Sequence, residues 1–209
     1  EGADQIDGGT GADQIDGGSG ADSILGGEGA DQIDGGTGAD QIDGGTGDDS
    51  ILGGEGSDVI AGGAGSDQID GGLGADQIAG GSGDDSILGG EGDDSILGDS
   101  GDDYIVGGIG SDAIDGGSGI DEIDYSTDGA AGGDAGVTVD LSEGTATDGF
   151  GDADTLSNIE NVKGTDKADQ LTGSAADNII LGEAGDDVIA GLDGADTIDG
   201  GSGIDEIDY

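Results

Sequence analysis

Residues 8–16 read Gly-Gly-Thr-Gly-Ala-Asp-Gln-Ile-Asp, and this nine-residue pattern recurs without a break in register as far as Asp124. Position 1 of the repeat is always glycine, position 6 is always aspartate and position 8 is always isoleucine. A partial copy, Glu1 to Ile6, precedes the first full repeat. A period this short predicts a solenoid in which each repeat contributes one turn and one short strand.

The composition provides little material for an ordinary hydrophobic core. The 209 residues include one Phe, three Tyr and no Trp, Met, Cys or Pro. Against 51 acidic residues stand only Lys163 and Lys167, so the formal net charge is −49. Low hydrophobicity with high net charge is typical of disordered chains. We therefore predict that the chain does not fold alone and that a multivalent cation supplies the missing stability.

Several classes of protein are excluded by the same composition. A chain with two basic residues cannot neutralise a phosphate backbone, which excludes nucleic-acid binding. The absence of proline and of a three-residue glycine period excludes a collagen helix. No apolar run approaches membrane-spanning length. There is no His, no Cys and no basic group beside a serine, so we expect no enzymatic activity.

The chain divides into three segments. Residues 1–124 form the first repeat array, and the nine-residue frame returns in a second array over 164–209. Residues 125–163 break the register, and we expect irregular β structure there that joins or caps the arrays. Within them the alternation Val-Thr-Val-Asp-Leu at 137–141 predicts a half-buried strand. The chain has no initiator methionine and begins inside a repeat, which we interpret as a piece of a longer protein.

The chemistry of the repeat favours a calcium site in each turn. Glycines at positions 1, 2 and 4 allow backbone angles that residues with a Cβ rarely adopt, so a tight turn can point several carbonyl oxygens inward. The aspartate at position 6 adds carboxylate oxygens. Two repeats complete one coil, so each turn stacks on the turn two repeats later. Ca²⁺ prefers such an all-oxygen shell, Mg²⁺ needs a smaller one, and Zn²⁺ or Cu²⁺ would favour His or Cys ligands, which the chain lacks.

These repeats resemble the RTX (repeats-in-toxin) family, also called hemolysin-type calcium-binding proteins, over residues 1–124 and 164–209. The resemblance implies an all-β fold, a right-handed parallel β-roll with calcium ions between stacked turns. It also implies that carbonyls at positions 1 to 4 and the position-6 carboxylates bind calcium. On this basis the turn 26–31 would face the turn 44–49 across one ion, through Gly26, Glu28 and Asp31 opposite Gly45, Gly47 and Asp49.

The candidate metal ligands are the position-6 aspartates of both arrays, which together would hold up to about fifteen calcium ions. They are Asp4, Asp13, Asp22, Asp31, Asp40, Asp49, Asp58, Asp67, Asp76, Asp85, Asp94, Asp103, Asp112, Asp121, Asp169, Asp187, Asp196 and Asp205. Two departures from the pattern weaken particular sites. Asp99 replaces the position-2 glycine, and the turns that end at Asp169 and Asn178 lack several glycines.

The resemblance implies a calcium-binding structural module of a secreted bacterial protein. Such a protein leaves the cell through type I secretion machinery and folds in the calcium-rich exterior, at the cell surface or beyond it. Two other roles stay open: a calcium-stiffened extender segment of a large surface adhesin, or the non-catalytic tail of a secreted enzyme or toxin. We expect the chain by itself to be monomeric, and its sequence does not identify the parent protein.

Overall fold

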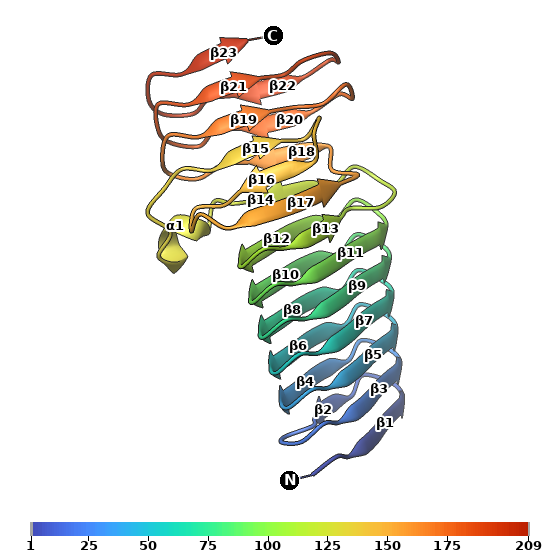
Figure 1. Ribbon diagram of the computed structural model, residues 1–209. Helices are drawn as coiled ribbons and strands as arrows, with labels where there is room; N and C mark the ends of the chain where they lie inside the picture. The colour runs from blue at the N-terminus through green and yellow to red at the C-terminus, as the bar shows by residue number, and fades with distance from the viewer. Residues whose placement is uncertain (1, 209) are drawn as a thin grey trace.

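The computed structural model describes residues 2–208 and shows a solenoid built from two parallel sheets (Figure 1). Glu1 and Tyr209, the outer ends of the two predicted arrays, lie outside the described residues. Among the described residues, one sheet contains 13 strands and the other contains 10. We call them sheet A and sheet B. The parallel β-roll expected from the repeats is therefore confirmed.

The first array contributes alternate strands to the two sheets. Sheet A receives β1 (Gln5–Thr10), β3 (Ser23–Glu28), β5 (Gln41–Thr46), β7 (Val59–Ala64), β9 (Gln77–Ser82), β11 (Ser95–Ser100) and β13 (Ala113–Asp115). Sheet B receives β2 (Gln14–Asp16), β4 (Gln32–Thr37), β6 (Ser50–Glu55), β8 (Gln68–Leu73), β10 (Ser86–Glu91), β12 (Tyr104–Ile109) and β14 (Glu122–Asp124). Two strands make one coil, so β1 to β14 form the seven coils that the repeat predicts.

The register between coils is eighteen residues, which is two repeats. Ile24 of β3 pairs with Ile42 of β5, and Ile42 pairs in turn with Ile60 of β7. Side chains alternate across a strand, so position 8 points inward while positions 7 and 9 point outward. The position-8 isoleucines from Ile24 to Ile123 are at most 3% exposed and form a continuous core column between the sheets.

The turns depend on glycines in the left-handed region of backbone conformation. Gly27 at position 2 has φ +116° and Gly29 at position 4 has φ +125°. A Cβ on Gly29 would clash with the carbonyl oxygen of Gly11 in the preceding coil. Asp99 occupies position 2 without breaking this turn, because it also adopts positive φ, +70°, and stays in register with Gly81.

The segment 125–163 inserts an antiparallel meander into sheet A. It begins with the short helix α1 (Asp128–Ala131) and continues with β15 (Thr138–Asp140), β16 (Thr145–Thr147), β17 (Ala153–Ser157) and β18 (Asn161–Lys163). In sheet A the order is β13-β17-β16-β15-β19, whereas in sheet B β14 pairs directly with β18. Sheet A therefore gains two strands that sheet B lacks. The strand expected within residues 137–141 is confirmed as β15.

The solenoid resumes after the insertion and runs to the other end of the molecule. Its strands are β19 (Gln170–Thr172), β20 (Ile179–Leu181), β21 (Val188–Ala190), β22 (Thr197–Asp199) and β23 (Glu206–Asp208). Val137, Val139, Leu156 and Val162 join the isoleucine column, so both sheets and the core pass through the insertion. The two ends of the chain lie at opposite ends of the solenoid (Figure 1). Within residues 2–208, no helix has the length and apolar character needed to span a membrane.

Candidate metal centres in the stacked turns

The position-6 aspartates form two ladders, one along each edge of the solenoid. In both ladders the backbone N–H of one aspartate donates to Oδ1 of the next, over 2.7–2.9 Å. Ladder A consists of Asp4, Asp22, Asp40, Asp58, Asp76, Asp94 and Asp112. Ladder B consists of Asp13, Asp31, Asp49, Asp67, Asp85, Asp103 and Asp121. Oδ1 therefore locks each turn onto its neighbour.

The second carboxylate oxygen has no such partner. Oδ2 of every ladder aspartate from Asp13 to Asp121 is buried and accepts no hydrogen bond. It points into its own turn, against the position-1 glycine. A Cβ added to Gly44 would lie 2.6 Å from Asp49 Oδ2 and 2.5 Å from the carbonyl oxygen of Gly62. Only glycine at position 1 leaves room between these two oxygens.

Backbone carbonyls supply further unpartnered oxygens in the same turns. The position-4 carbonyls, such as those of Gly20 and Gly29, accept no backbone hydrogen bond in the described part of the chain. The position-3 carbonyls do accept one, because the N–H of Gly29 donates to the carbonyl of Thr46 over 2.7 Å. Each turn therefore presents at least one anionic oxygen and one carbonyl oxygen with no proton donor.

Such an oxygen set fits a hard divalent cation. A buried carboxylate oxygen without a partner is costly, and a cation between two turns would bind the carboxylates and carbonyls together. Within residues 2–208, no three His, Cys, Asp or Glu side chains converge as a metal-binding group. Each turn offers one carboxylate, so most ligands of an ion would be carbonyls. That mixture is the coordination that Ca²⁺ accepts.

The electrostatics of the metal-free turns point the same way. Burial raises the pKa of Asp94 to about 7; the N–H of Asp76 lowers it, and the charges of Asp112 and Asp76 raise it further. Burial likewise raises the pKa of Asp85 and Asp121 to about 6. A bound divalent ion is a large local positive charge, so it would reverse these shifts and hold the carboxylates ionised.

Two ligand-like acids in the insertion continue the ladders and were not identified from the sequence. The N–H of Asp112 donates to Asp154 Oδ1 over 3.0 Å, and the N–H of Asp121 donates to Glu160 Oε2 over 3.0 Å. Each of these acids is followed two residues later by an aliphatic residue, as in positions 6 to 8 of the repeat. The two segments read Asp-Thr-Leu at 154–156 and Glu-Asn-Val at 160–162. That three-residue remnant of positions 6 to 8 could have revealed them.

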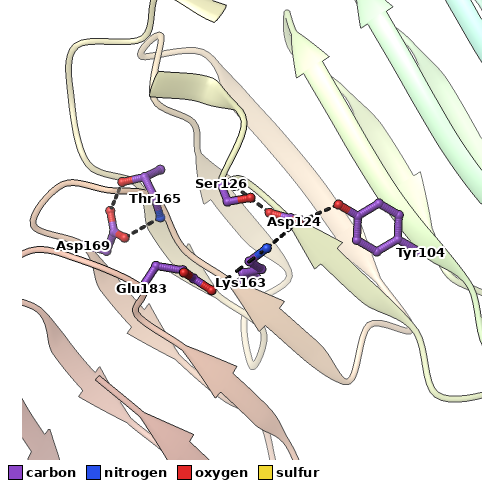
Figure 2. Close-up of polar contacts among 7 residues, drawn as sticks. All are labelled: Tyr104, Asp124, Ser126, Lys163, Thr165, Asp169 and Glu183. Carbon is purple, nitrogen blue, oxygen red and sulfur yellow. Dashed lines mark hydrogen bonds and ion pairs between the residues drawn. The ribbon is translucent and has the colours of Figure 1, made fainter. Parts of the chain in front are cut away.

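The second array contains two turns whose oxygens are already satisfied. Asp169 Oδ2 accepts the N–H of Thr165 over 2.7 Å, and Oδ1 accepts the Thr165 hydroxyl over 2.8 Å (Figure 2). Oδ1 also accepts the N–H of Val137 over 2.8 Å. Asn178 Oδ1 accepts the N–H of Ser174 over 2.7 Å in the next turn. Asp169 therefore has no unpartnered oxygen, unlike the ladder aspartates.

The remaining candidates in the second array resemble the first more closely. Asp187 Oδ2 is buried without a partner. The N–H of Asp169 donates to Asp187 Oδ1 over 2.9 Å, and the N–H of Asp187 donates to Asp205 Oδ1 over 3.2 Å. The N–H of Asn178 donates to Asp196 Oδ1 over 3.0 Å. The ladder geometry is thus restored after the insertion.

At Asp124, which is buried, the protein supplies a lysine as the counter-charge. Figure 2 shows Asp124 Oδ2 accepting the Tyr104 hydroxyl over 2.5 Å and Lys163 Nζ over 3.2 Å, while Oδ1 accepts the N–H of Ser126 over 2.6 Å. Burial opposes ionisation of Asp124, but the contacts with Ser126, Tyr104 and Lys163 outweigh it and lower the pKa. Lys163 also lies 4.0 Å from Glu183.

Comparison with known proteins identifies the repeat. The family model described as RTX calcium-binding nonapeptide repeat (4 copies) matches in overlapping segments that cover residues 1–123 and 154–207. The second stretch begins at Asp154, the residue that continues ladder A. No similar chain was found among curated proteins.

Proposed function

Because this chain belongs to the RTX calcium-binding nonapeptide repeat family, we propose that it is a structural module that folds on binding calcium between its stacked turns. The observation that carries the proposal is the row of buried, unpartnered Oδ2 atoms from Asp13 to Asp121. Metal binding then supplies part of the folding free energy, because the sites exist only when the turns are stacked.

We assign the ligands by their oxygens. Each ion contacts the position-6 carboxylates and the free carbonyls of two stacked turns. These carboxylates come from the ladder aspartates and from Asp187, Asp196 and Asp205. The turn that ends at Asp169 is assigned no metal, because Thr165 and Val137 donate hydrogen bonds to both of its carboxylate oxygens. The number of ions is therefore lower than a count of position-6 aspartates would predict.

Circular dichroism during calcium addition tests the module. We expect disorder in chelator, a cooperative gain of strand signal near roughly 0.1–1 mM Ca²⁺, and little response to Mg²⁺, which sheds its water reluctantly. A fully ordered solenoid in EDTA would refute the proposal.

We place the module outside the cell, where calcium is abundant. Support comes from the formal charge of −49, which opposes compaction until cations bind, and from the coupling of folding to metal. An unfolded chain in a low-calcium cytosol would suit export by a type I system. The expected signature is rapid proteolysis at submicromolar calcium and protection at millimolar calcium; equal digestion rates at both concentrations would contradict it.

A second candidate role is that of a calcium-stiffened extender between other domains of a larger protein. It is favoured by the position of the chain ends at opposite ends of one continuous solenoid (Figure 1). A role without catalysis is supported by the lack of His and Cys and by carboxylates that serve as ladder contacts. Single-molecule stretching with and without calcium distinguishes a stiff extender from a loose appendage.

A further inference from the structure

The last turn of ladder A, residues 107–112, stacks on the inserted meander and not on another nonapeptide repeat. In the regular coils, the atom nearest to a Cβ built on Gly89 is the carbonyl oxygen of Gly107, the position-1 glycine of the next coil. At Gly107 itself the nearest atoms are Asp112 Oδ2 and side-chain carbon of Ile114, and no carbonyl oxygen takes that place. At this point the turn 107–112 therefore has no carbonyl oxygen as close as the one that stacks on Gly89.

The start of β17, which follows the loop from β16, takes the stacking position after the turn 107–112. The N–H of Ala153 donates to the Ser111 hydroxyl over 3.4 Å, and the N–H of Asp112 donates to Asp154 Oδ1. This loop begins with Asp148, which is 1% exposed. The N–H of Asp148 donates to the carbonyl of Asp152 over 3.1 Å, which sets Asp148 beside the start of β17, the strand whose Asp154 contacts Asp112.

The two oxygens of Asp148 have different environments. Oδ1 accepts three backbone N–H groups, from Phe150 over 3.0 Å and from Gly151 and Asp152 over 2.7 Å each. Oδ2 is buried and accepts none. Asp112 Oδ2 is likewise buried without a partner. The loop thus holds its aspartate by one oxygen and leaves the other free inside the protein.

The neighbouring acids are already satisfied. Asp154 Oδ2 accepts the Tyr125 hydroxyl over 3.0 Å, and Asp128 Oδ2 accepts the N–H of Gly149 over 2.9 Å. Lysine provides no neutralising charge here, because in the described structure Lys163 pairs with Asp124 and Glu183, and Lys167 pairs with Asp166. Asp112 and Asp148 are left as the two acids with an unpartnered buried oxygen.

We propose that Asp148 is a calcium ligand that closes the last site of ladder A, together with Asp112 Oδ2 and carbonyl oxygens of the turn 107–112. This inference rests on the proposed calcium-binding function and adds a ligand from outside the nonapeptide repeats. The ion would tie the inserted meander to the end of the first array, so calcium would couple two segments that the repeat alone does not connect.

Asp148→Asn tests the assignment with little disturbance of the loop. The amide oxygen still accepts the three N–H groups, while the anionic Oδ2 is lost. The matched control is Asp140→Asn, at the end of β15, where the turn into β16 begins. Asp140 Oδ1 accepts the Ser142 hydroxyl over 2.6 Å and the N–H of Glu143 over 3.0 Å, and neither of its oxygens is buried without a partner.

Native mass spectrometry at saturating calcium counts the ions on each chain. We expect the Asp148→Asn chain to hold one ion fewer than the unaltered chain, and the Asp140→Asn chain to hold the same number. Equal counts for all three chains overturn the role of Asp148 and leave the nonapeptide sites intact. An unaltered chain that binds no calcium at all refutes the proposed function instead.

A second measurement covers the case in which the Asp148→Asn chain does not reach the strand content of the unaltered chain. A crystal structure of the unaltered, calcium-loaded chain then decides the question directly. An ion within about 2.3–2.6 Å of Asp148 Oδ2 supports the proposal. A calcium-loaded structure with ions in the regular turns and none at Asp148 overturns it.

Discussion

The ladder aspartates from Asp22 to Asp121 use their two oxygens differently. Oδ1 accepts the N–H of the aspartate one coil earlier, which is a contact between protein atoms. Oδ2 has no protein partner and is available to a cation. Loss of the side chain therefore removes both a charge-assisted hydrogen bond and a metal ligand, whereas loss of an outward acid removes neither.

Asp67→Ala should raise the calcium concentration at the folding midpoint, because Asp67 belongs to the sites on both sides of its turn. The lost hydrogen bond to a charged acceptor alone costs about 1.5–3 kcal/mol of folding free energy. Calcium titration by circular dichroism measures the change. The control is Asp43→Ala, which removes an exposed carboxylate at position 9; an unchanged midpoint for Asp67→Ala would remove Asp67 from the ligands.

Asp99→Gly should stabilise the calcium-bound solenoid. Asp99 adopts φ +70°, where a residue with a Cβ is less stable than glycine by about 1–2 kcal/mol. The gain shows as a higher midpoint in thermal unfolding at fixed calcium. A lower midpoint would mean that the Asp99 side chain makes a favourable contact, such as an additional metal contact, that outweighs the backbone cost.

The metal-free chain should gain structure when it is acidified. Burial raises the folded-state pKa of Asp94 from the ordinary 3.8 to about 7 and that of Asp85 to about 6. The folded state therefore binds more protons than the unfolded state between these values. The resulting stabilisation is fully present below about pH 4 and is lost as the pH rises through 6 to 7.

Circular dichroism in EDTA across pH 4 to 7 checks this dependence, and we expect the strand signal to increase toward pH 4. Most proteins lose structure on acidification, so the sign is diagnostic. With calcium present, protons compete for the same oxygens and the calcium midpoint should rise as the pH falls. A metal-free chain whose signal does not change with pH would show that the carboxylates are not the obstacle to folding.

Individual turns reach the same shape in two ways. The ladder turns leave an oxygen for an ion, whereas the turn 164–169 places the Thr165 hydroxyl and N–H on Asp169. Next to it, Ser174 and Asn178 make equivalent contacts without a carboxylate. A hydroxyl-bearing residue at position 2 thus accompanies hydrogen bonds to the position-6 side chain that the ladder turns lack.

Thr165→Ala should destabilise this turn by about 1.5–3 kcal/mol without changing the number of bound calcium ions, because the lost hydroxyl donates to a charged acceptor. Thermal unfolding measures the first quantity and native mass spectrometry the second. Thr155→Ala, which alters an exposed threonine of β17, is the control. A loss of one ion with Thr165→Ala would instead indicate that the turn binds calcium.

The molecule as a whole is a charged rod held together along its length. Sheet A stacks 13 strands, so at about 4.8 Å per strand the rod is about 60 Å long. Ions between the turns would neutralise the inner carboxylates, while outward acids such as Asp43 stay exposed to solvent. These outward charges favour solubility.

Calcium should therefore shrink the chain considerably. An unfolded chain of 209 residues has a radius of gyration of about 50 Å, and a rod 60 Å long has one of about 20 Å. Small-angle X-ray scattering with EDTA and with millimolar calcium measures both. Screening by NaCl weakens repulsion but provides no ligand bridge, so a similar contraction in concentrated NaCl without calcium would contradict ion bridging.

The sequence by itself determined the regular part of this protein. The fixed isoleucine supplies the core column, the glycines predicted the turns, and the two-repeat coil predicted the eighteen-residue register that joins Ile24 to Ile42. These features follow from local chemistry repeated at a constant period, so each repeat carries the same information. The choice of calcium rests on the same constancy, because every turn offers oxygen ligands alone.

Only the tertiary structure decided what happens where the period fails. The contact of Asp112 with Asp154 spans 42 residues, and that of Asp124 with Lys163 spans 39. No period links such pairs, because the path of the meander through sheet A sets which loop faces which turn. For the same reason the structure alone reveals Asp148 as a buried acid with a free oxygen. Contacts between elements with unlike sequences depend on packing, which local patterns do not encode.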